Sequence, residues 1–508
     1  MSALSPGVAA AMPTALAAAW VVYLGALAVL GLYGAHRLSL VARAWRGRRR
    51  APAPPPLPAD DALPVVTVQL PLYNEQAVAA RVIAAAAALD WPRDRLELQI
   101  LDDSTDATAA RCAAEVARWR ARGTDAVHLH RADRAGWKAG ALEAGRRVAR
   151  GELVLVLDAD FVPPADFLRR TVGHFADPGV ALVQARWGHL NRERSLLTRL
   201  QALLLDGHFA VEQAGRAAAG ACFNFNGTAG LWRAVAIADA GGWHADTLTE
   251  DLDLSYRAAL RGWRFVYAGD VVAPAELPAD LRAFKSQQHR WAKGSVECAR
   301  KLVPAVVQAP WPWWRRLEAV AHLTHNLPYL VTLVLVLAGG ACLGLGGGPT
   351  WAPLVHAASA AVTLAVLATF VAASAARGAR LRAVAQVPAL VALTAGLAVS
   401  QGKAVIEALI GHRTPFVRTP KDGAVGATPP PVRRYRVPPT VTAWLELAAA
   451  AYLAGCAGLA AARGAPLGAA VLALFAAGTL LVSGAPASAA AWVREHRAEK
   501  KRARQVRP

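Results

Sequence analysis

Short apolar runs alternate with Ala-rich stretches between residues 65 and 157. Residues 65–70, 96–101 and 153–157 have the length and the Val and Leu content of buried strands. The stretches between them, residues 77–89 and 107–121, are rich in Ala and favour helices. This alternation predicts an α/β fold with a mostly parallel sheet, whose ligands bind at the carboxyl ends of the strands.

Longer apolar segments flank this region and predict a helical transmembrane part. Each is long enough to cross a hydrocarbon core of ~30 Å at ~1.5 Å per residue. These five segments are residues 14–36, 321–345, 353–376, 441–461 and 466–490. The uncharged first residues, followed by arginines between 43 and 50, place the N-terminus outside and the next domain in the cytoplasm.

A further apolar segment, residues 383–410, is ambiguous. If it crossed the membrane, the basic flanks at 377–382 and 412–421 would face opposite sides, against the usual distribution of positive charge. We therefore interpret it as an interfacial or re-entrant helix, with a sixth span as the alternative.

Composition agrees with a membrane protein that carries one sizeable polar domain. The 508 residues are 55% hydrophobic, and 56 Lys and Arg against 36 Asp and Glu give a net charge of +20. Much of this basic excess lies beside the apolar segments, which favours membrane topology and lipid contact over a nucleic-acid partner. The five cysteines show no CxxC spacing, so we expect neither a zinc site nor a disulfide framework.

Three carboxylates suggest chemistry in the polar region. Asp158 and Asp160 follow a buried strand and offer the hard oxygens that Mg²⁺ or Mn²⁺ prefers. Asp251, in the segment Thr249-Glu250-Asp251, is free to take a proton from an attacking hydroxyl as a general base. The alternatives are a strand-end turn for the first pair and a helix N-cap with acidic residues for 249–251.

Eight segments, in order, resemble those of family 2 glycosyltransferases, and most of all the cellulose synthase-like A and C group of mannan, glucomannan and glucan synthases. The segments are Leu72-Tyr73-Asn74-Glu75, Leu101-Asp102-Asp103-Ser104-Thr105-Asp106, Lys138-Ala139-Gly140-Ala141-Leu142, Asp158-Ala159-Asp160-Phe161, Gln184-Ala185-Arg186-Trp187, Phe225-Asn226-Gly227-Thr228-Ala229-Gly230, Thr249-Glu250-Asp251-Leu252-Asp253-Leu254 and Gln287-Gln288-His289-Arg290-Trp291. The resemblance is dense over residues 65–300 and thins through the apolar part.

This resemblance implies a GT-A-like catalytic domain and roles for individual residues. Asp103 would contact the nucleotide base, Asp158 and Asp160 would hold the diphosphate and its metal, and Asp251 would be the general base. A QxxRW-like signature would bind the donor diphosphate and the acceptor sugar at the mouth of a transmembrane tunnel, through Gln287, Arg290 and Trp291. Further candidates for substrate binding are Asp102, Lys138, Asn226, Gly227 and Glu250.

Residues 416–421 resemble the FxVTxK gating loop of cellulose synthases, with Phe416, Thr419 and Lys421 as the matching candidates. Arg418 departs from that pattern, because it stands where the family has Val.

The chain is thus divided into an anchor and basic segment (1–50), a Pro-rich linker (51–64), a cytosolic GT-A domain (65–310), and transmembrane and interfacial helices with a gating-like loop at 411–438 (311–508).

We expect a multi-pass membrane enzyme that works on the cytoplasmic side. We place it in a bacterial inner membrane, because its Ala-, Arg- and Gly-rich composition is typical of a GC-rich bacterial genome. It would use a nucleotide sugar, GDP-mannose or UDP-glucose, and a divalent cation to extend a β-1,4-linked polysaccharide with inversion. Inversion follows from one base without an evident second nucleophile. Its partners would be a glycan or lipid acceptor, membrane lipids and an accessory export protein. Two alternatives remain: single transfer onto a lipid, as in ceramide glucosyltransferases, and a non-catalytic membrane-tethered binding protein.

Overall fold

A computed structural model describes most of the chain. The described residues are 6–47, 55–375, 380–414, 418–419, 421–423, 425–426 and 441–484, with side chains from 14 onward and none over 374–382. Phe416, named above as a candidate, lies outside them, as do residues 427–440 and the basic tail.

One mixed sheet organises the polar domain in the part of the chain that the structure describes. Its strands are β1 (Val66–Leu72), β2 (Leu96–Asp102), β3 (Asp125–His130), β4 (Leu153–Val156), β5 (Val180–His189), β6 (Gly230–Arg233) and β7 (Arg264–Ala275). They lie in the order β3-β2-β1-β4-β6-β5-β7. Neighbours are parallel except where β6 pairs antiparallel with β4 and β5, so the predicted mostly parallel sheet is confirmed.

Helices cover both faces of this sheet. Packed on one face are α2 (Ala79–Ala87) and α3 (Thr108–Arg120), and on the other α4 (Trp137–Val148), α8 (Ala234–Asp239) and α9 (Glu250–Leu260). Each face of the sheet has its own hydrophobic core, because side chains alternate in direction along a strand. Leu153 and Leu155 belong to the core under α2 and α3, and Val154 and Val156 belong to the core under α4, α8 and α9. β3 was not predicted, because its sequence alternates polar and apolar residues and lacks an apolar run.

Five helices among the described residues are long and apolar enough to cross a membrane. They are α1 (Pro6–Gly47), α12 (Pro328–Leu345), α13 (Ala352–Ala375), α16 (Val441–Ala462) and α17 (Pro466–Ser483). The predicted span 321–345 begins too early. Residues 321–323 belong to a separate helix, α11 (Trp313–Leu323), and the spanning helix α12 begins only at Pro328, after a break in the chain.

The ambiguous segment forms two helices, α14 (Arg380–Gly396) and α15 (Ala398–Leu409), that bend by 42° at their junction. A bend of this kind fits a broken span as well as a re-entrant segment, so both interpretations stay open.

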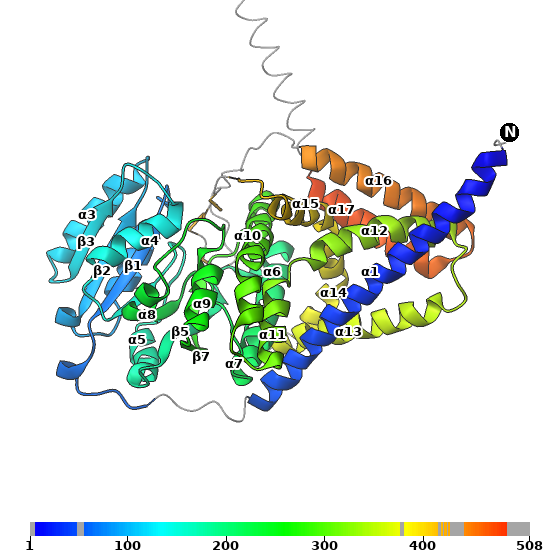
Figure 1. Cartoon of the computed structure of the whole chain (residues 1–508). Helices are drawn as coiled ribbons and strands as arrows, with labels where there is room; N and C mark the ends of the chain where they lie inside the picture. Colours follow the sequence, from blue (N-terminus) through cyan, green and yellow to red (C-terminus); the bar gives the residue numbers. More distant parts are fainter. Residues whose placement is uncertain are drawn as a thin grey trace, which may run out of the picture.

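α10 (Leu281–Gln308) connects the two parts of the molecule. Figure 1 shows it between the sheet and the apolar helices, and it packs against α9, α11 and α15. The remaining helical elements are α5 (Phe167–Thr171), α6 (Leu196–Gly207), α7 (Ala214–Ala218), the π-helix η5 (His208–Gln213), and the 3₁₀ turns η1 (Asp60–Ala62), η2 (Arg93–Arg95), η3 (Val172–Ala176) and η4 (Arg192–Arg194).

Ion pairs with buried carboxylates connect the N-terminal helix α1 to η5 and α11. Arg37 on α1 lies 3.1 Å from Glu212 on η5, and Arg43 lies 3.2 Å from Glu318 on α11. Arg216 on α7 reaches the other oxygen of Glu318 at 3.2 Å. Because both carboxylates are nearly inaccessible to water, α1 supplies charges that the fold needs as well as apolar surface.

Candidate active site

A deep cavity lies at the carboxyl ends of β1 and β4, between the sheet, α10 and residues 418–421. Most candidates named from the sequence line it, namely Asp103, Lys138, Asp158, Asp160, Asn226, Gly227, Glu250, Asp251, Gln287, Arg290, Trp291, Thr419 and Lys421. Segments from across the chain therefore converge on one space.

Asp158 and Asp160 stand just after β4, as their position behind an apolar run predicts. The chain turns there through a hydrogen bond from the Phe161 N–H to the Asp158 carbonyl, at 3.0 Å. Each carboxylate faces a lysine: Lys138 Nζ lies 2.6 Å from Asp158 Oδ1, and Lys421 Nζ lies 2.7 Å from Asp160 Oδ2. Carboxylate oxygens are the donors that a hard divalent cation prefers, although each lysine competes with such a cation for its carboxylate.

Lys138 holds several parts of the cavity together. Besides Asp158, its ammonium donates to the Gly227 carbonyl at 2.9 Å and lies 3.7 Å from Glu250 Oε1. Burial opposes its charge, yet Asp158 and Glu250 raise the pKa of Lys138 above its usual value. The lysine is therefore a permanent cation in the centre of the site.

Asp251 is in the first turn of α9, directly after Glu250. Its Oδ1 accepts a hydrogen bond from the Leu252 N–H at 2.8 Å. Burial, together with the negative charge of Glu250, raises the pKa of Asp251 to about 7. A carboxylate with a pKa near neutrality is suited to accept a proton from a hydroxyl group.

The structure bears out part of the helix-cap alternative, because Thr249 is the N-cap residue of α9 and acidic residues lie in the first turn. The Thr249 side chain makes no capping hydrogen bond and lies 3.4 Å from Cys298 Sγ on α10. α10 approaches closely because residue 294 is Gly; a Cβ there would lie 2.6 Å from the Thr249 side chain. This close packing sets Asp251 and the α10 signature side by side.

Arg290 and Trp291 on α10 face the cavity from the membrane side. Burial lowers the pKa of Arg290 to about 10, while Glu250 and Asp158 act in the opposite direction, so the guanidinium remains charged at neutral pH. Its Nη2 donates to Thr419 Oγ1 at 3.2 Å. The ring centroid of Trp291 lies 6.5 Å from that of Trp187, so the two indoles form an aromatic wall suited to the apolar face of a sugar.

Asn226 is held by three side chains. Its N–H donates to Gln184 Oε1 at 3.0 Å, its Oδ1 accepts from Gln213 Nε2 at 2.6 Å, and its Nδ2 lies 3.0 Å from His208 Nε2. His208 and Gln213 both belong to the π-helix η5, which also carries Glu212. The partner of Arg37 on α1 therefore lies on the same turn as the supports of Asn226.

Several residues that line the cavity, Glu75 and Arg418 among them, were not predicted to take part in the site. Burial raises the pKa of Glu75 to about 7, and its Oε1 lies 3.1 Å from Arg418 Nη1. Arg418 is thus inside the site, although it departs from the family pattern. Glu75 could have been found, because it is an acidic residue shortly after the carboxyl end of β1, the same edge of the sheet at which Asp103 follows β2. The others are Trp187, Glu276 and Arg134.

The neighbours Asp102 and Asp103 point to different sides, and only Asp103 lines the cavity. Asp103 forms a two-pronged ion pair with Arg131, at 2.6 and 2.7 Å. Asp102, at the end of β2, instead faces His128 at 2.9 Å, outside the cavity. The structure therefore does not bring Asp102 to the substrate, because successive side chains of a strand alternate in direction.

Comparison with known proteins agrees with this geometry. Residues 64–294 match the family model described as glycosyltransferase like family 2. Glucomannan 4-beta-mannosyltransferase 2 of Arabidopsis thaliana is 48% identical over 250 residues, covering 48% of this chain and 47% of that protein. Glucomannan 4-beta-mannosyltransferase 1 of Oryza sativa subsp. japonica is 45% identical over 264 residues, covering 50% and 51%. The chain spans about half the length of these curated relatives.

The fold also resembles that of a solved structure. Mannosyltransferase PcManGT from Pyrobaculum calidifontis, in complex with GDP-Man and Mn²⁺, superposes with a TM-score of 0.53 at 23% identity. The match covers 77% of this chain and 100% of the other. The polar domain is thus a GT-A-like fold, and its residues 64–294 are similar to family 2 glycosyltransferases, including plant glucomannan 4-beta-mannosyltransferases.

Proposed function

We propose that this protein is a membrane-embedded, inverting mannosyltransferase that extends a β-1,4-linked glycan from a nucleotide-activated sugar. The observation that carries the proposal is the meeting of Asp103, Asp160, Asp251 and Arg290 in one cavity beside the apolar helices. The similarity over residues 64–294 to plant glucomannan 4-beta-mannosyltransferases supports mannose as the sugar.

In this proposal Asp251 is the general base. Its raised pKa suits it to take the proton of the acceptor hydroxyl as that oxygen attacks the anomeric carbon of the donor. The bond from that carbon to the diphosphate breaks on the opposite face, so the configuration inverts. A single base suffices, because the leaving diphosphate needs charge compensation instead of a proton.

The positive side chains provide part of that compensation. Arg290 remains charged despite its burial, and its guanidinium can pair with two phosphate oxygens at once. Lys421 and Arg418 enter the cavity from the loop side and lie close to the same region. Gln287 and Thr419 line the cavity beside them and are proposed to complete the polar contacts to the donor.

Asp158 and Asp160 would hold a divalent cation, Mg²⁺ or Mn²⁺, which would neutralise the donor diphosphate. Both groups are carboxylates, which such a cation prefers as ligands, and the cation would bind in competition with Lys138 and Lys421. The resemblance in fold to a mannosyltransferase with GDP-Man and Mn²⁺ agrees with such a cation.

The remaining assignments concern recognition of donor and acceptor. Asp103, fixed by Arg131, is proposed to contact the nucleotide base, and GDP-mannose is the donor we favour. Trp291 and Trp187 would stack against the acceptor sugar, with Asn226 and Gly227 beside it. The apolar helices that meet this end of the cavity would guide the product across a bacterial inner membrane, with the catalytic domain in the cytoplasm. Lipid contact and an accessory export protein stay predictions.

The proposal is tested with the full chain in lipid nanodiscs, supplied with labelled GDP-mannose or UDP-glucose and a short β-1,4-mannan acceptor. We expect transfer from GDP-mannose, 1,4 linkages and products longer than one added sugar. Asp251→Asn should lower kcat by about 10²- to 10⁴-fold while donor affinity is largely retained.

Asp94→Asn is the matched control, because its side chain is 79% exposed and far from the cavity lining. It should work at the rate of the unaltered protein. A product consisting only of a one-sugar glycolipid would refute polymer extension, and an Asp251→Asn variant with full turnover would refute the assignment of the base.

A further inference from the structure

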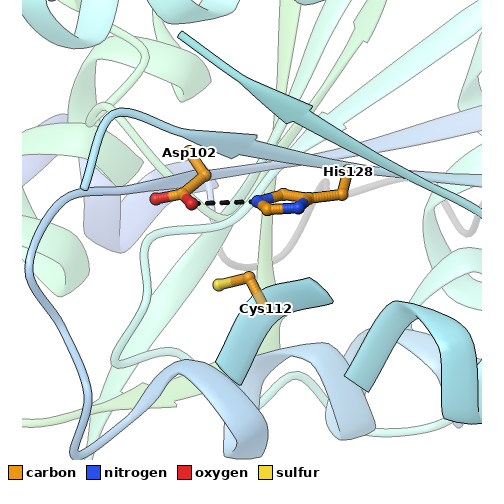
Figure 2. Close-up of side chains that lie close together, drawn as sticks. All are labelled: Asp102, Cys112 and His128. Carbon is orange, nitrogen blue, oxygen red and sulfur yellow. Dashed lines mark hydrogen bonds and ion pairs between the residues drawn. The ribbon is translucent and has the colours of Figure 1, made fainter. Parts of the chain in front are cut away.

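A second cluster of reactive side chains lies behind the active site, on the edge of the sheet. It consists of Asp102 at the end of β2, Cys112 on α3 and His128 on β3, and Figure 2 shows the three side chains directed toward one another. One ligand atom from each lies within 4.8 Å of the other two. Asp102 and Cys112 are fully buried, and His128 is half-buried. None of the three lines the active-site cavity.

A fourth donor lies next to the three. His130 is two residues after His128 on β3, so both imidazoles point to the same face of the sheet. His128 Nε2 lies 2.9 Å and His130 Nδ1 3.2 Å from the same Asp102 oxygen, Oδ2. The other oxygen, Oδ1, accepts the Ser104 N–H at 2.9 Å. Two imidazoles thus share a single carboxylate oxygen, and the Cys112 thiol lies close to the same carboxylate.

A second group of possible metal ligands in the described residues differs from this cluster in one respect. His244, Asp246 and Asp253 form a similar group, but Lys301 Nζ already occupies it, 2.8 Å from Asp253 and 2.9 Å from Asp246. Among the described residues, the ion pairs of Asp102 are made with histidines only. The first cluster therefore has ligand atoms but no lysine or arginine to balance its carboxylate.

We propose that Asp102, Cys112 and His128 bind a zinc ion, with His130 or a water molecule in the fourth position. Thiolate, imidazole and carboxylate are the ligands of protein zinc, at bond lengths of about 2.0 to 2.3 Å. In a tetrahedral site such bonds place the ligand atoms about 3.3 to 3.8 Å apart, so closing the observed cluster onto an ion takes only small side-chain rotations. His130 has room to turn, since its side chain is 44% exposed.

Zinc binding would release protons from two of its ligands. Zinc binds the thiolate of Cys112 and the neutral imidazole of His128, so the thiol proton, and any proton on the imidazole, goes to solvent. Without a metal, burial and the charges of Asp102 and Glu75 raise the pKa of Cys112 to about 12, which keeps the thiol protonated. Binding is thus expected to strengthen as pH rises, because less work is needed to remove these protons.

Such an ion would fix two strand ends that lead into the active site. Asp102 directly precedes Asp103, and His130 directly precedes Arg131; Asp103 and Arg131 form the ion pair at the cavity wall. The Arg131 N–H also donates to the Asp102 carbonyl at 2.9 Å. The zinc would thus stabilise the backbone beneath this ion pair.

Cobalt substitution tests the site without any assay of activity. The full chain in detergent is stripped of metal with a chelator and titrated with Co²⁺, whose bond to a thiolate gives a charge-transfer band in the near ultraviolet. We expect one equivalent to produce this band together with the strong visible absorption of tetrahedral Co²⁺, and Zn²⁺ to remove both. The carboxylates of the active site cannot produce a thiolate band, so they do not interfere.

Variants assign the band to the cluster. Cys112→Ser should abolish it, and His128→Gln should weaken Co²⁺ binding by about tenfold or more. Cys298→Ser is the matched control, because Cys298 is equally buried but lies on α10, and it should keep the band. Should Cys112→Ser fail to fold, His128→Gln still decides, since the His128 side chain is partly exposed. Absence of the band in the unaltered protein, or its persistence in either His128→Gln or Cys112→Ser at full strength, would overturn the proposal.

Discussion

The ammonium of Lys421 lies 2.7 Å from Oδ2 of Asp160, at a carboxylate that we propose binds a divalent cation. Its neighbour Asp422 is also anchored, since its N–H donates to Glu276 Oε1 at 2.9 Å. A lysine ammonium and a metal ion at the same carboxylate repel each other, so cation binding favours a lysine that has turned away. The loop that carries Lys421 and the cation are therefore expected to compete.

We predict that Lys421→Gln increases the affinity of the donor-free protein for Mn²⁺ by about tenfold, or about 1.4 kcal/mol, because the competing charge is removed. Electron paramagnetic resonance of free Mn²⁺ measures this affinity directly. Lys421→Arg keeps the charge and should leave the affinity near that of the unaltered protein. Equal affinities in all three proteins would show that the ammonium does not compete.

Gly227 should not tolerate a side chain, because it lies directly against Asp251, the proposed base. Its φ is +81°, and a Cβ there would lie 3.0 Å from Asp251 Oδ2. Gly227→Ala should therefore displace the base and reduce kcat by about tenfold or more, in addition to a backbone cost of about 1 kcal/mol.

Gly123→Ala separates the two effects. Gly123 has a nearly identical φ of +80°, and the nearest atom to its Cβ would be the end of the Arg93 side chain at 3.5 Å. Both variants should lose similar thermal stability, whereas only Gly227→Ala should lose turnover. Equal loss of turnover in both would mean that the contact with Asp251 is unimportant.

The rate should rise with pH through about 7 and then level off. Burial raises the pKa of Asp251 to about 7, and only the ionised carboxylate can accept a proton, so protonation below that pH removes the base. Because the charge of Lys138 lowers this pKa, Lys138→Gln should move the acidic limb of the kcat profile to higher pH. Lys138→Arg keeps the charge and should leave the limb in place. A limb that stays fixed in Lys138→Gln would assign it to another group.

Arg37 should support the acceptor side of the cavity from α1. It lies 3.1 Å from Glu212, whose pKa is held well below its usual value by Arg37 and His208 although burial opposes the charge. Arg37→Met leaves this carboxylate buried with less compensation, which should cost about 1 to 3 kcal/mol of stability. Because Asn226 is bound to residues of the same turn, the KM for acceptor should also rise.

The double variant Arg37→Met/Glu212→Gln checks the cause. With both charges removed it should recover most of the thermal stability that Arg37→Met loses. A double variant that is as unstable as the sum of the two single changes would exclude coupling between these residues.

The local sequence already determined much of the site. Asp103, Asp158 and Asp160 could be found because apolar runs mark strands, and parallel strands bring their carboxyl ends to the same rim. Asp251 and Arg290 were found through segments that resemble a known family, and both line the cavity. The five membrane-length helices followed from the length of their apolar segments, which is a local property of the chain.

Other features depend on which segments meet, and no local pattern carries that information. The start of α12 was misplaced because the break between α11, which ends at Leu323, and α12, which begins at Pro328, follows from how the two helices pack and was not recognised in the sequence. Asp102 and Asp103 have the same chemistry, yet strand alternation against β3, which the sequence did not reveal, sends one to His128 and the other to the cavity. Cysteine spacing argued against a zinc site, whereas three separate elements bring Asp102, Cys112 and His128 within reach of one ion. Composition and periodicity thus determined most of the helices, strands and candidate side chains. Contacts between residues far apart in the chain decided which of these side chains lie in the same site.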